Sequence, residues 1–428
     1  MLLKRMRAAV SDPSLVPTHV RNAALEHLLG LIAASGERPP SDRTPADRQL
    51  CDIACLGAAG SPDAAACAEL VLRATAMAGA APGAALDLLQ SIAREPHLMS
   101  DAAKSAVQAL LYSHVLPLLG SVLSWCTASP GDPSTAPLAA AALAALTLWR
   151  ASGLRLRDLV ASSASPAAAA ASAVNDTSPP APPSLLLHVA WALGSSHAAV
   201  LEAAVDAVEA FVPDGEEDEN YPSGAAAARQ TALGVLANAI TAKGNGDGLD
   251  EHAERCVCRA AAAIASHTRR SSGGSKSAGT AVPLLVELLL QATLHAGKPA
   301  SAICLQAWPD VLRAGHDPEL VYKRLLEVLL GRSVYESEDG NDDDEAQVYR
   351  EQLLADCLIP VYDVLRHTFL ARLWDAALSR PAESGWQAVE AAVFCLRVVA
   401  PQVSSRALLV QKPPAATAAA ARASGRPG

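Results

Sequence analysis

A chain of 428 residues with a formal net charge of −10 is long enough for two or three ordinary domains, or for one extended stack of helical repeats. Its hydrophobic fraction of 51% rests mainly on Ala and Leu, with only 3 Phe and 6 Tyr, which argues against a fold built from sheets. The acidic balance, without any long basic block, argues against direct DNA or RNA binding and favours a basic protein partner.

The first residues, Met-Leu-Leu-Lys-Arg-Met-Arg, are charged and have no apolar segment behind them, so we do not expect a signal peptide. The longest apolar run, 138 to 149, has about a dozen residues and ends at Arg150, whereas a membrane span needs about 20. We therefore expect a soluble chain with no membrane span. The nine cysteines lie mostly in apolar helical runs, as buried thiols of a reducing compartment do.

Apolar residues recur at helical spacing along almost the whole chain, and no strand-like alternation competes with them. Turn signals such as Ser-Pro-Asp at 61 to 63 separate the apolar stripes. The period predicts helices over roughly 18 to 34, 45 to 58, 63 to 79, 83 to 94, 101 to 124, 138 to 151, 183 to 193, 196 to 212, 224 to 242, 249 to 267, 280 to 296, 299 to 313, 317 to 332, 346 to 378 and 384 to 400.

Helices of this length, joined by short turns and paired at a period of about 40 residues, are typical of HEAT or armadillo repeats. The sequence therefore predicts an all-α fold, an α-solenoid in which antiparallel helix pairs stack into a right-handed superhelix over residues 1 to 403. Such a stack has two long surfaces, one of them concave and suited to wrapping a partner.

Four segments interrupt the helical pattern. Residues 127 to 137 and 163 to 184 are rich in Ser, Pro and Ala and cannot bury enough surface to order themselves, so we expect inserted loops. Residues 268 to 278 predict a flexible basic loop, and residues 336 to 345 an acidic loop. The segment 404 to 428, composed of Ala, Pro and Arg, predicts a disordered tail.

The acidic loop carries seven carboxylates in ten residues. One interpretation is a solvated loop kept open by mutual repulsion, and the other is a landing site for an Arg- or Lys-rich partner. Both interpretations stay open, and they are compatible. The candidate partner-binding residues are Glu336, Glu338, Asp339, Asp342, Asp343, Asp344 and Glu345.

No metal site, cofactor site or catalytic site is predicted. Cys256 and Cys258 point about 200 degrees apart on a helix, so with His252 they make a poor zinc site. Residues 243 to 254 resemble a calcium loop only superficially, because Lys243 stands where the first carboxylate ligand belongs. No His shares a known local signature with a Ser or Cys nucleophile, and glycine-rich phosphate loops are absent, so we do not expect an enzyme.

The six tryptophans fall mostly in the apolar stripes of predicted helices. We therefore expect them to be buried in packing rather than to form a ligand cage. They are Trp125, Trp149, Trp191, Trp308, Trp374 and Trp386.

Two consecutive segments carry a resemblance to a known family. The acidic loop is followed by Val-Tyr-Arg-Glu-Gln-Leu-Leu-Ala-Asp-Cys-Leu-Ile-Pro-Val-Tyr-Asp-Val-Leu at 348 to 365, and then by Gly-Trp-Gln-Ala-Val-Glu-Ala-Ala-Val-Phe-Cys-Leu-Arg-Val-Val-Ala at 385 to 400. Together with upstream segments in the same order, these resemble the importin-β superfamily, and within it the transportin-SR and importin-thirteen subfamily. The upstream segments are 49 to 54, 148 to 153, 201 to 208 and 303 to 312.

The resemblance implies a HEAT-repeat nuclear transport receptor that shuttles between nucleus and cytoplasm. Its implied partners are protein cargo of basic or Arg/Ser-rich type, the GTPase Ran and nucleoporins. Members of this superfamily are considerably longer, so we expect the chain to correspond to the middle of a receptor, without the N-terminal Ran-binding repeats and the C-terminal repeats. The alternative is a HEAT-repeat scaffold or adaptor for complex assembly unrelated to transport.

Overall fold

The computed structural model describes residues 18–36, 44–59, 65–130, 132, 134–161, 184–212, 223–244, 249–271, 281–313, 318–334, 347–378 and 385–410. Within these residues every regular element is helical and no strand forms, which confirms the predicted all-α class. The chain divides into two compact units, Met1–Leu288 and Leu289–Gly428, and the division lies inside one helix. Each unit is described by itself.

The first unit is a series of helices separated by short connections. Most begin and end within a few residues of the predicted bounds, but the short helix α9, which follows the turn at Gly153, was not predicted. The helices are α2 (Thr18–Gly36), α3 (Pro45–Ala59), α4 (Ala65–Met77), α5 (Pro82–Arg94), α6 (Asp101–Leu110), α7 (Leu116–Ala128), α8 (Thr135–Trp149), α9 (Leu156–Ala161), α11 (Leu185–Leu193), α12 (Ala198–Phe211), α13 (Ser223–Gly244) and α14 (Glu251–Ser271). A π-helical segment, η3 (Leu111–Val115), joins α6 to α7.

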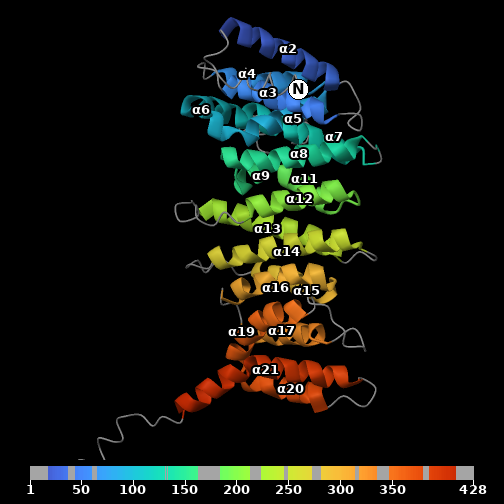
Figure 1. Cartoon of the computed structure of the whole chain (residues 1–428), viewed down its shortest axis with the longest axis vertical. Coiled ribbons are helices and arrows are strands. Elements are labelled where there is room, and N and C mark those ends of the chain that lie inside the picture. Colours follow the sequence, from blue (N-terminus) through green and yellow to red (C-terminus); the bar gives the residue numbers. More distant parts are fainter. Residues whose placement is uncertain are drawn as a thin grey trace, which may run out of the picture. The chain divides into compact units, whose positions relative to one another are not determined.

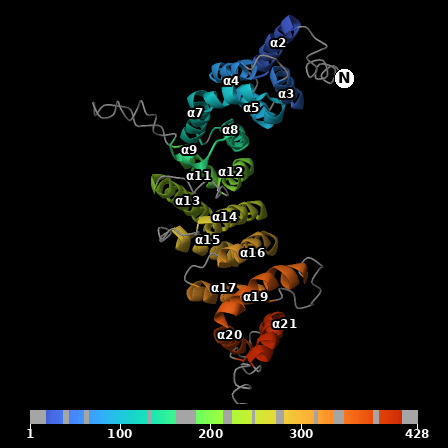
Figure 2. The same cartoon turned by 90° about the vertical axis from the view of Figure 1, so that its left-hand side faces the viewer.

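Helices of the first unit pack in two rows. In one row α3, α5, α8, α12 and α14 pack each on the next, and in the other α7, α11 and α13 do the same. Each helix also packs against its neighbour in the chain, as α4 does with α5, α7 with α8 and α11 with α12. Figure 1 shows the helices following one another in chain order, and Figure 2 shows the two rows of this unit side by side.

The alanine-rich composition suits this packing. Helix α8 packs against α5 on one side and α12 on the other, and it buries Ala139, Ala142 and Ala145 completely. Because an alanine side chain is small, two helix backbones can approach closely, and the surrounding leucines then fill the remaining space.

Among the described residues, the continuous helix Asp101–Ala128 is long and apolar enough to cross a membrane, judged by length and composition alone. Its sequence contains no long unbroken apolar run, because Tyr112, Ser113 and His114 interrupt it. In the structure its first half packs against α4 and its second half against α8 and α11. These are the contacts of a helix inside a helical layer, and the expected lack of a membrane span stays a prediction.

The second unit contains the end of α15 and the remaining helices. They are α15 (Ala281–His295), α16 (Lys298–Arg313), α17 (Pro318–Arg332), the π-helical segment η6 (Tyr349–Leu354) leading into α19 (Ala355–Leu365), α20 (His367–Leu378) and α21 (Gly385–Val410). Helix α19 packs against α16, α17 and α20, and α21 packs against α17, α19 and α20. Here too Figure 2 shows two rows, with α16, α19 and α21 in one and α17 and α20 in the other.

Arginine side chains connect helices that are not adjacent in the chain. Arg259 on α14 donates to Asp206 at 2.6 Å and to Glu209 at 3.0 Å, both on α12. Arg332 at the end of α17 donates to three backbone carbonyls at the C-terminus of α15, among them that of Thr293 at 2.8 Å. A cation at this position satisfies carbonyls that have no donor within the helix and interacts favourably with the helix dipole.

The predicted single helix over 346 to 378 is wrong, because the chain breaks it at Arg366. This residue has φ 42° and ψ −102°, outside the helical region, and its N–H still bonds to the carbonyl of Tyr362 at 2.9 Å. Beyond the break, the ring of Phe369 packs edge-on against Tyr362 with centroids 5.6 Å apart. Neither Gly nor Pro marks the break, so packing between α19 and α20 decides it, and the sequence carries no local signal.

Several predicted loops and the tail begin or end elsewhere in the structure. Helix α7 continues to Ala128 and α8 begins at Thr135, so the loop expected at 127 to 137 is shorter. Helix α14 continues to Ser271 and α21 to Val410, because Ala, Arg and Leu near both ends favour helix. The rest of the predicted loops and tail, at 163 to 183, 272 to 278, 336 to 345 and 411 to 428, lies outside the described residues.

The core of the second unit is centred on Trp308. Its side chain is fully buried on α16, and its Nε1 donates to Thr293 Oγ1 on α15 at 3.0 Å. Thr293 in turn donates to the carbonyl of Leu289 at 2.7 Å. Trp386 on α21, by contrast, is 52% exposed.

We expect Trp308→Ala to lower the free energy of unfolding by about 3 to 5 kcal/mol, because it leaves a large cavity. It also leaves the hydroxyl of Thr293 without its indole donor. The exposed Trp386→Ala, the matched control, should change it by less than about 0.5 kcal/mol. Urea denaturation followed by far-UV circular dichroism measures both values, and equal losses in the two variants would contradict the assignment of Trp308 to the core.

Candidate protein-binding site

The residues of the predicted acidic loop, from Glu336 to Glu345, lie outside the described part of the chain. The hypothesis that they bind a partner therefore stays a prediction. The described residues begin again at Gln347, directly before the π-helical segment η6. The candidate site consists of η6, α19 and the helices that pack on them.

An ion pair between a buried arginine and a half-buried glutamate joins η6 to α21. Arg350 is 6% exposed, and its Nη2 donates to both carboxylate oxygens of Glu390, at 2.8 and 3.0 Å. The same guanidinium lies over the ring of Phe394, 4.4 Å from its centroid, while Arg397 lies 5.5 Å from that centroid. The ring is therefore contacted by two cations, an arrangement that favours a fixed position of η6 on α21.

The neighbouring Tyr349 joins η6 to α16. Its hydroxyl lies 2.9 Å from Ser301 Oγ, and burial raises the pKa of this tyrosine above its ordinary value. Tyr349 and Arg350 thus point to different helices, and Glu390 belongs to the second segment of the family resemblance. The structure brings the segments 348 to 365 and 385 to 400 into direct contact through Arg350 and Glu390.

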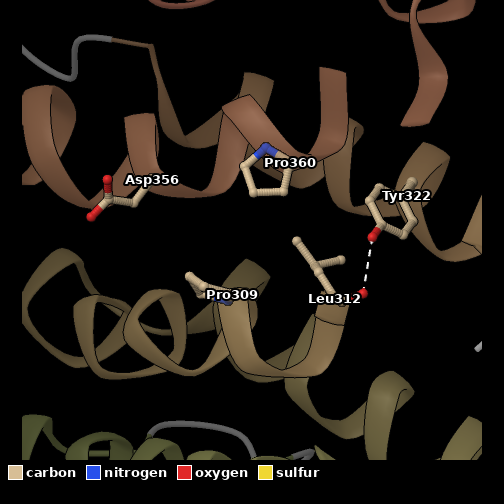
Figure 3. Close-up of a pocket in the computed structure, with 5 residues that line it drawn as sticks. All are labelled: Pro309, Leu312, Tyr322, Asp356 and Pro360. Carbon is tan, nitrogen blue, oxygen red and sulfur yellow. Dashed lines mark hydrogen bonds between the residues drawn. The ribbon is translucent and has the colours of Figure 1, made fainter. Parts of the chain in front are cut away.

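A cleft of about 340 Å³ lies between α16, α17 and α19 (Figure 3). The side chains of α16 and α19 face each other across the cleft, Tyr322 stands at one end and Asp356 at the other. Its lining residues are Pro309, Leu312, Tyr322, Asp356 and Pro360.

Two prolines inside helices shape the cleft. Proline has no N–H and its ring crowds the carbonyl four residues earlier, so each proline opens its helix on one side. In α16 the carbonyl of Leu305, which has lost its donor to Pro309, accepts instead from the thiol of Cys357 at 3.3 Å. In α19 the corresponding carbonyl is that of Asp356, one turn before Pro360. The apolar periodicity of both helices hid these prolines from the sequence analysis.

Tyr322 stands at the apolar end of the cleft. Its side chain is 7% exposed, its hydroxyl donates to the carbonyl of Leu312 at 3.1 Å, and burial raises its pKa above the ordinary value. The hydroxyl is therefore already engaged. Asp356 at the other end is exposed and makes no ion pair with any described residue.

An apolar stripe is exposed on α21. It consists of Trp386, Val389, Val393 and Leu396, which are 52%, 44%, 57% and 47% exposed and follow one another at spacings of three and four residues. The opposite side of α21 is buried against α19 and α20. Helix α21 is thus apolar on two sides, and the helices around it cover one of them.

The prediction that the tryptophans are buried is wrong for half of them. Trp149 and Trp308 are fully buried and Trp191 is partly buried. Trp125, Trp374 and Trp386 are 44%, 67% and 52% exposed. Helical spacing identifies residues that share a face, but it does not tell which face another helix covers.

The residues weighed as metal ligands contact protein groups. His252 Nε2 lies 3.7 Å from Cys256 Sγ, and the described residues contain no group of three His, Cys, Asp or Glu that could hold a metal ion. At the superficial calcium loop, Lys243 donates to the carbonyl of Ser195 at 2.9 Å and Asp250 accepts from the N–H of Ala253 at 2.7 Å. Asp250 therefore caps the N-terminus of α14.

All nine cysteines are free and buried, which confirms the expected buried thiols. Burial raises the pKa of Cys357 to about 12 and those of Cys67, Cys126 and Cys395 to about 11. Because the thiolate is the reactive form, these side chains are poor nucleophiles at neutral pH.

A hydrogen-bonded histidine that the sequence analysis missed joins α7 to α11. His188 is 3% exposed, with Nε2 3.1 Å from Ser124 Oγ and Nδ1 3.1 Å from Thr127 Oγ1. Thr127 donates its own proton to the carbonyl of Leu123, so its oxygen accepts from Nδ1–H and leaves Nε2 to accept from Ser124. The partners are more than sixty residues apart in sequence, so no local signature could reveal them.

Comparison with known proteins gives no family. A scan against protein-family models and a search of curated proteins found no match to the chain. The resemblance to the importin-β superfamily therefore rests on the residue patterns alone, and the nuclear transport function stays a proposal.

The buried ring of His188 makes the stability of the fold depend on pH. Burial lowers the pKa of His188 below its value in the unfolded chain, about 6.5, so the folded state prefers the neutral ring. The resulting stability is complete above about pH 6.5 and is lost as the pH falls through that value towards the folded pKa. We expect His188→Gln to flatten the dependence of urea stability on pH in this range. The exposed His97→Gln is the control, and an unchanged profile in the His188 variant would contradict the assignment.

The ion pair between η6 and α21 contributes to the stability of the fold. Glu390→Gln leaves the buried Arg350 without its carboxylate, and we expect a loss of about 3 kcal/mol in the free energy of unfolding. Glu351→Gln is the matched control, because it removes a surface pair with Arg397 whose partners are 47% and 64% exposed. It should cost no more than about 1 kcal/mol. Urea denaturation compares the two, and a larger loss for the surface pair would show that Arg350 does not anchor η6.

Proposed function

We propose that the chain is a HEAT-type α-solenoid that binds other macromolecules as a nuclear transport receptor of the importin-β type. The observation that carries the proposal is the packing order of the first unit. There α3, α5, α8, α12 and α14 form one row and α7, α11 and α13 form another, and each of these helices contacts the next one of its row and a neighbour in the chain. This order is the one expected of stacked helix pairs in a repeat protein.

The surface of the second unit supports a binding role. Large apolar side chains at Trp374, Trp386 and Val393 are exposed, and surfaces of this kind mark sites of interaction with other proteins. The contact between Arg350 and Glu390 also gives a structural reason for the two segments on which the family resemblance depends.

In the proposed function the chain carries basic or Arg/Ser-rich protein cargo and responds to Ran and nucleoporins while it shuttles between nucleus and cytoplasm. Each helix pair of a solenoid contacts only its neighbours, so small changes in each pair add up to a large change in curvature. Binding of Ran to one part of the stack can then weaken binding of cargo to another. The acidic loop would contribute electrostatic attraction for the basic partner.

Affinity capture tests this proposal. We expect the immobilised full chain, or a longer gene product that includes the N-terminal Ran-binding repeats, to retain Ran loaded with GTP and to retain little Ran loaded with GDP. A chain in which Asp342, Asp343 and Asp344 are changed to Asn and Glu345 to Gln should bind an Arg/Ser-rich peptide more weakly and with a flatter dependence on salt. Equal retention of the two Ran forms, or of neither, contradicts the transport function and favours a HEAT adaptor unrelated to transport.

A further inference from the structure

We infer that the cleft between α16, α17 and α19 binds an extended peptide segment in which an apolar side chain is followed by Lys or Arg. The inference rests on the proposed function as a protein-binding scaffold, and it specifies the chemistry of the partner at this cleft. The side chains that line the cleft account for both the apolar residue and the cation of the peptide.

The part of the cleft between Pro309 and Tyr322 suits an apolar side chain. Pro309 and Leu312 line it from α16, Pro360 faces them from α19, and the Tyr322 side chain stands at the end (Figure 3). The Tyr322 hydroxyl already donates to the Leu312 carbonyl, so it has no proton left for a ligand. A volume of about 340 Å³ is at the lower end of the range for ligand sites, about 300 to 1,000 Å³, and holds a side chain with some of its backbone.

The end of the cleft at Asp356 suits a cation. Asp356 is exposed there and has no ion-pair partner among the described residues. Three other carboxylates of this unit already have partners: Glu327 bonds to Arg372, Glu351 to Arg397 and Glu390 to Arg350. A Lys or Arg of the peptide can therefore pair with Asp356 without displacing an internal arginine.

Saturation-transfer NMR on the full chain measures this binding with blocked tetrapeptides. The probe is acetyl-Gly-Leu-Arg-Gly-amide, and the matched peptides replace Arg by Glu or Leu by Ser. We expect the Leu-Arg peptide to bind at least about fivefold more tightly than either matched peptide, since each loses one of the two contacts.

Variants then locate the contact. Asp356→Asn should weaken binding of the Leu-Arg peptide by about three- to fivefold, as an exposed charge pair allows, and should not weaken that of the Leu-Glu peptide. Asp375→Asn is the matched control, because Asp375 is an exposed carboxylate of the same unit on α20 and does not line the cleft. Leu312→Trp, which fills the apolar end, should abolish binding of the Leu-Arg peptide in a chain whose circular dichroism is unchanged.

Three results would overturn the inference: equal affinity for the three peptides, unchanged binding by the Asp356 variant, or no saturation transfer to the Leu-Arg peptide at millimolar concentration. The Ran experiment is independent of these outcomes. Peptide binding without Ran binding contradicts only the transport function. Ran binding without peptide binding contradicts only the assignment of this cleft.

Discussion

An amphipathic helix cannot bury its apolar side alone, and the packing of helix on helix in this chain depends on that constraint. Helix α8 illustrates it, because α7 covers only part of its surface and α5 and α12 must cover the rest. The alanines at these contacts allow two helices to approach closely. Hydrophobic burial has no preferred direction, so arginines that connect non-adjacent helices, such as Arg259 between α14 and α12, add the directional contacts.

The helical class and the order of most helices could be predicted, because a period of 3.6 residues is a property of local sequence. The break at Arg366 could not, since it depends on how Phe369 packs against Tyr362. The exposure of Trp386 was missed for a related reason: α21 is apolar on both sides, and only tertiary packing selects the covered one. In the candidate site, Asp356 and Pro360 lie on one helix. The cleft that they line with Tyr322 and Leu312 forms only when α16, α17 and α19 pack together, so local sequence could not predict it.

The segment 348 to 365 combines two roles that its sequence does not separate. Tyr349 and Arg350 turn inward, to Ser301 and Glu390, and fix the segment in the unit. Asp356, two turns later, is exposed at the cleft. A rigid attachment next to an exposed carboxylate suits recognition, because less side-chain and backbone freedom is lost when a partner binds. The π-helical geometry of η6 fits this arrangement, since such segments occur often at functional sites.

The buried thiols have a consequence for how local motion in this chain can be observed. Six lie in the first unit, at Cys51, Cys55, Cys67, Cys126, Cys256 and Cys258, and three in the second, at Cys304, Cys357 and Cys395. Each is shielded by a different set of helices, and a labelling reagent reaches it only when those helices separate. The rate at which each cysteine is alkylated therefore measures how often its own part of the chain opens, so the protein carries a set of natural reporters of local unfolding along its length.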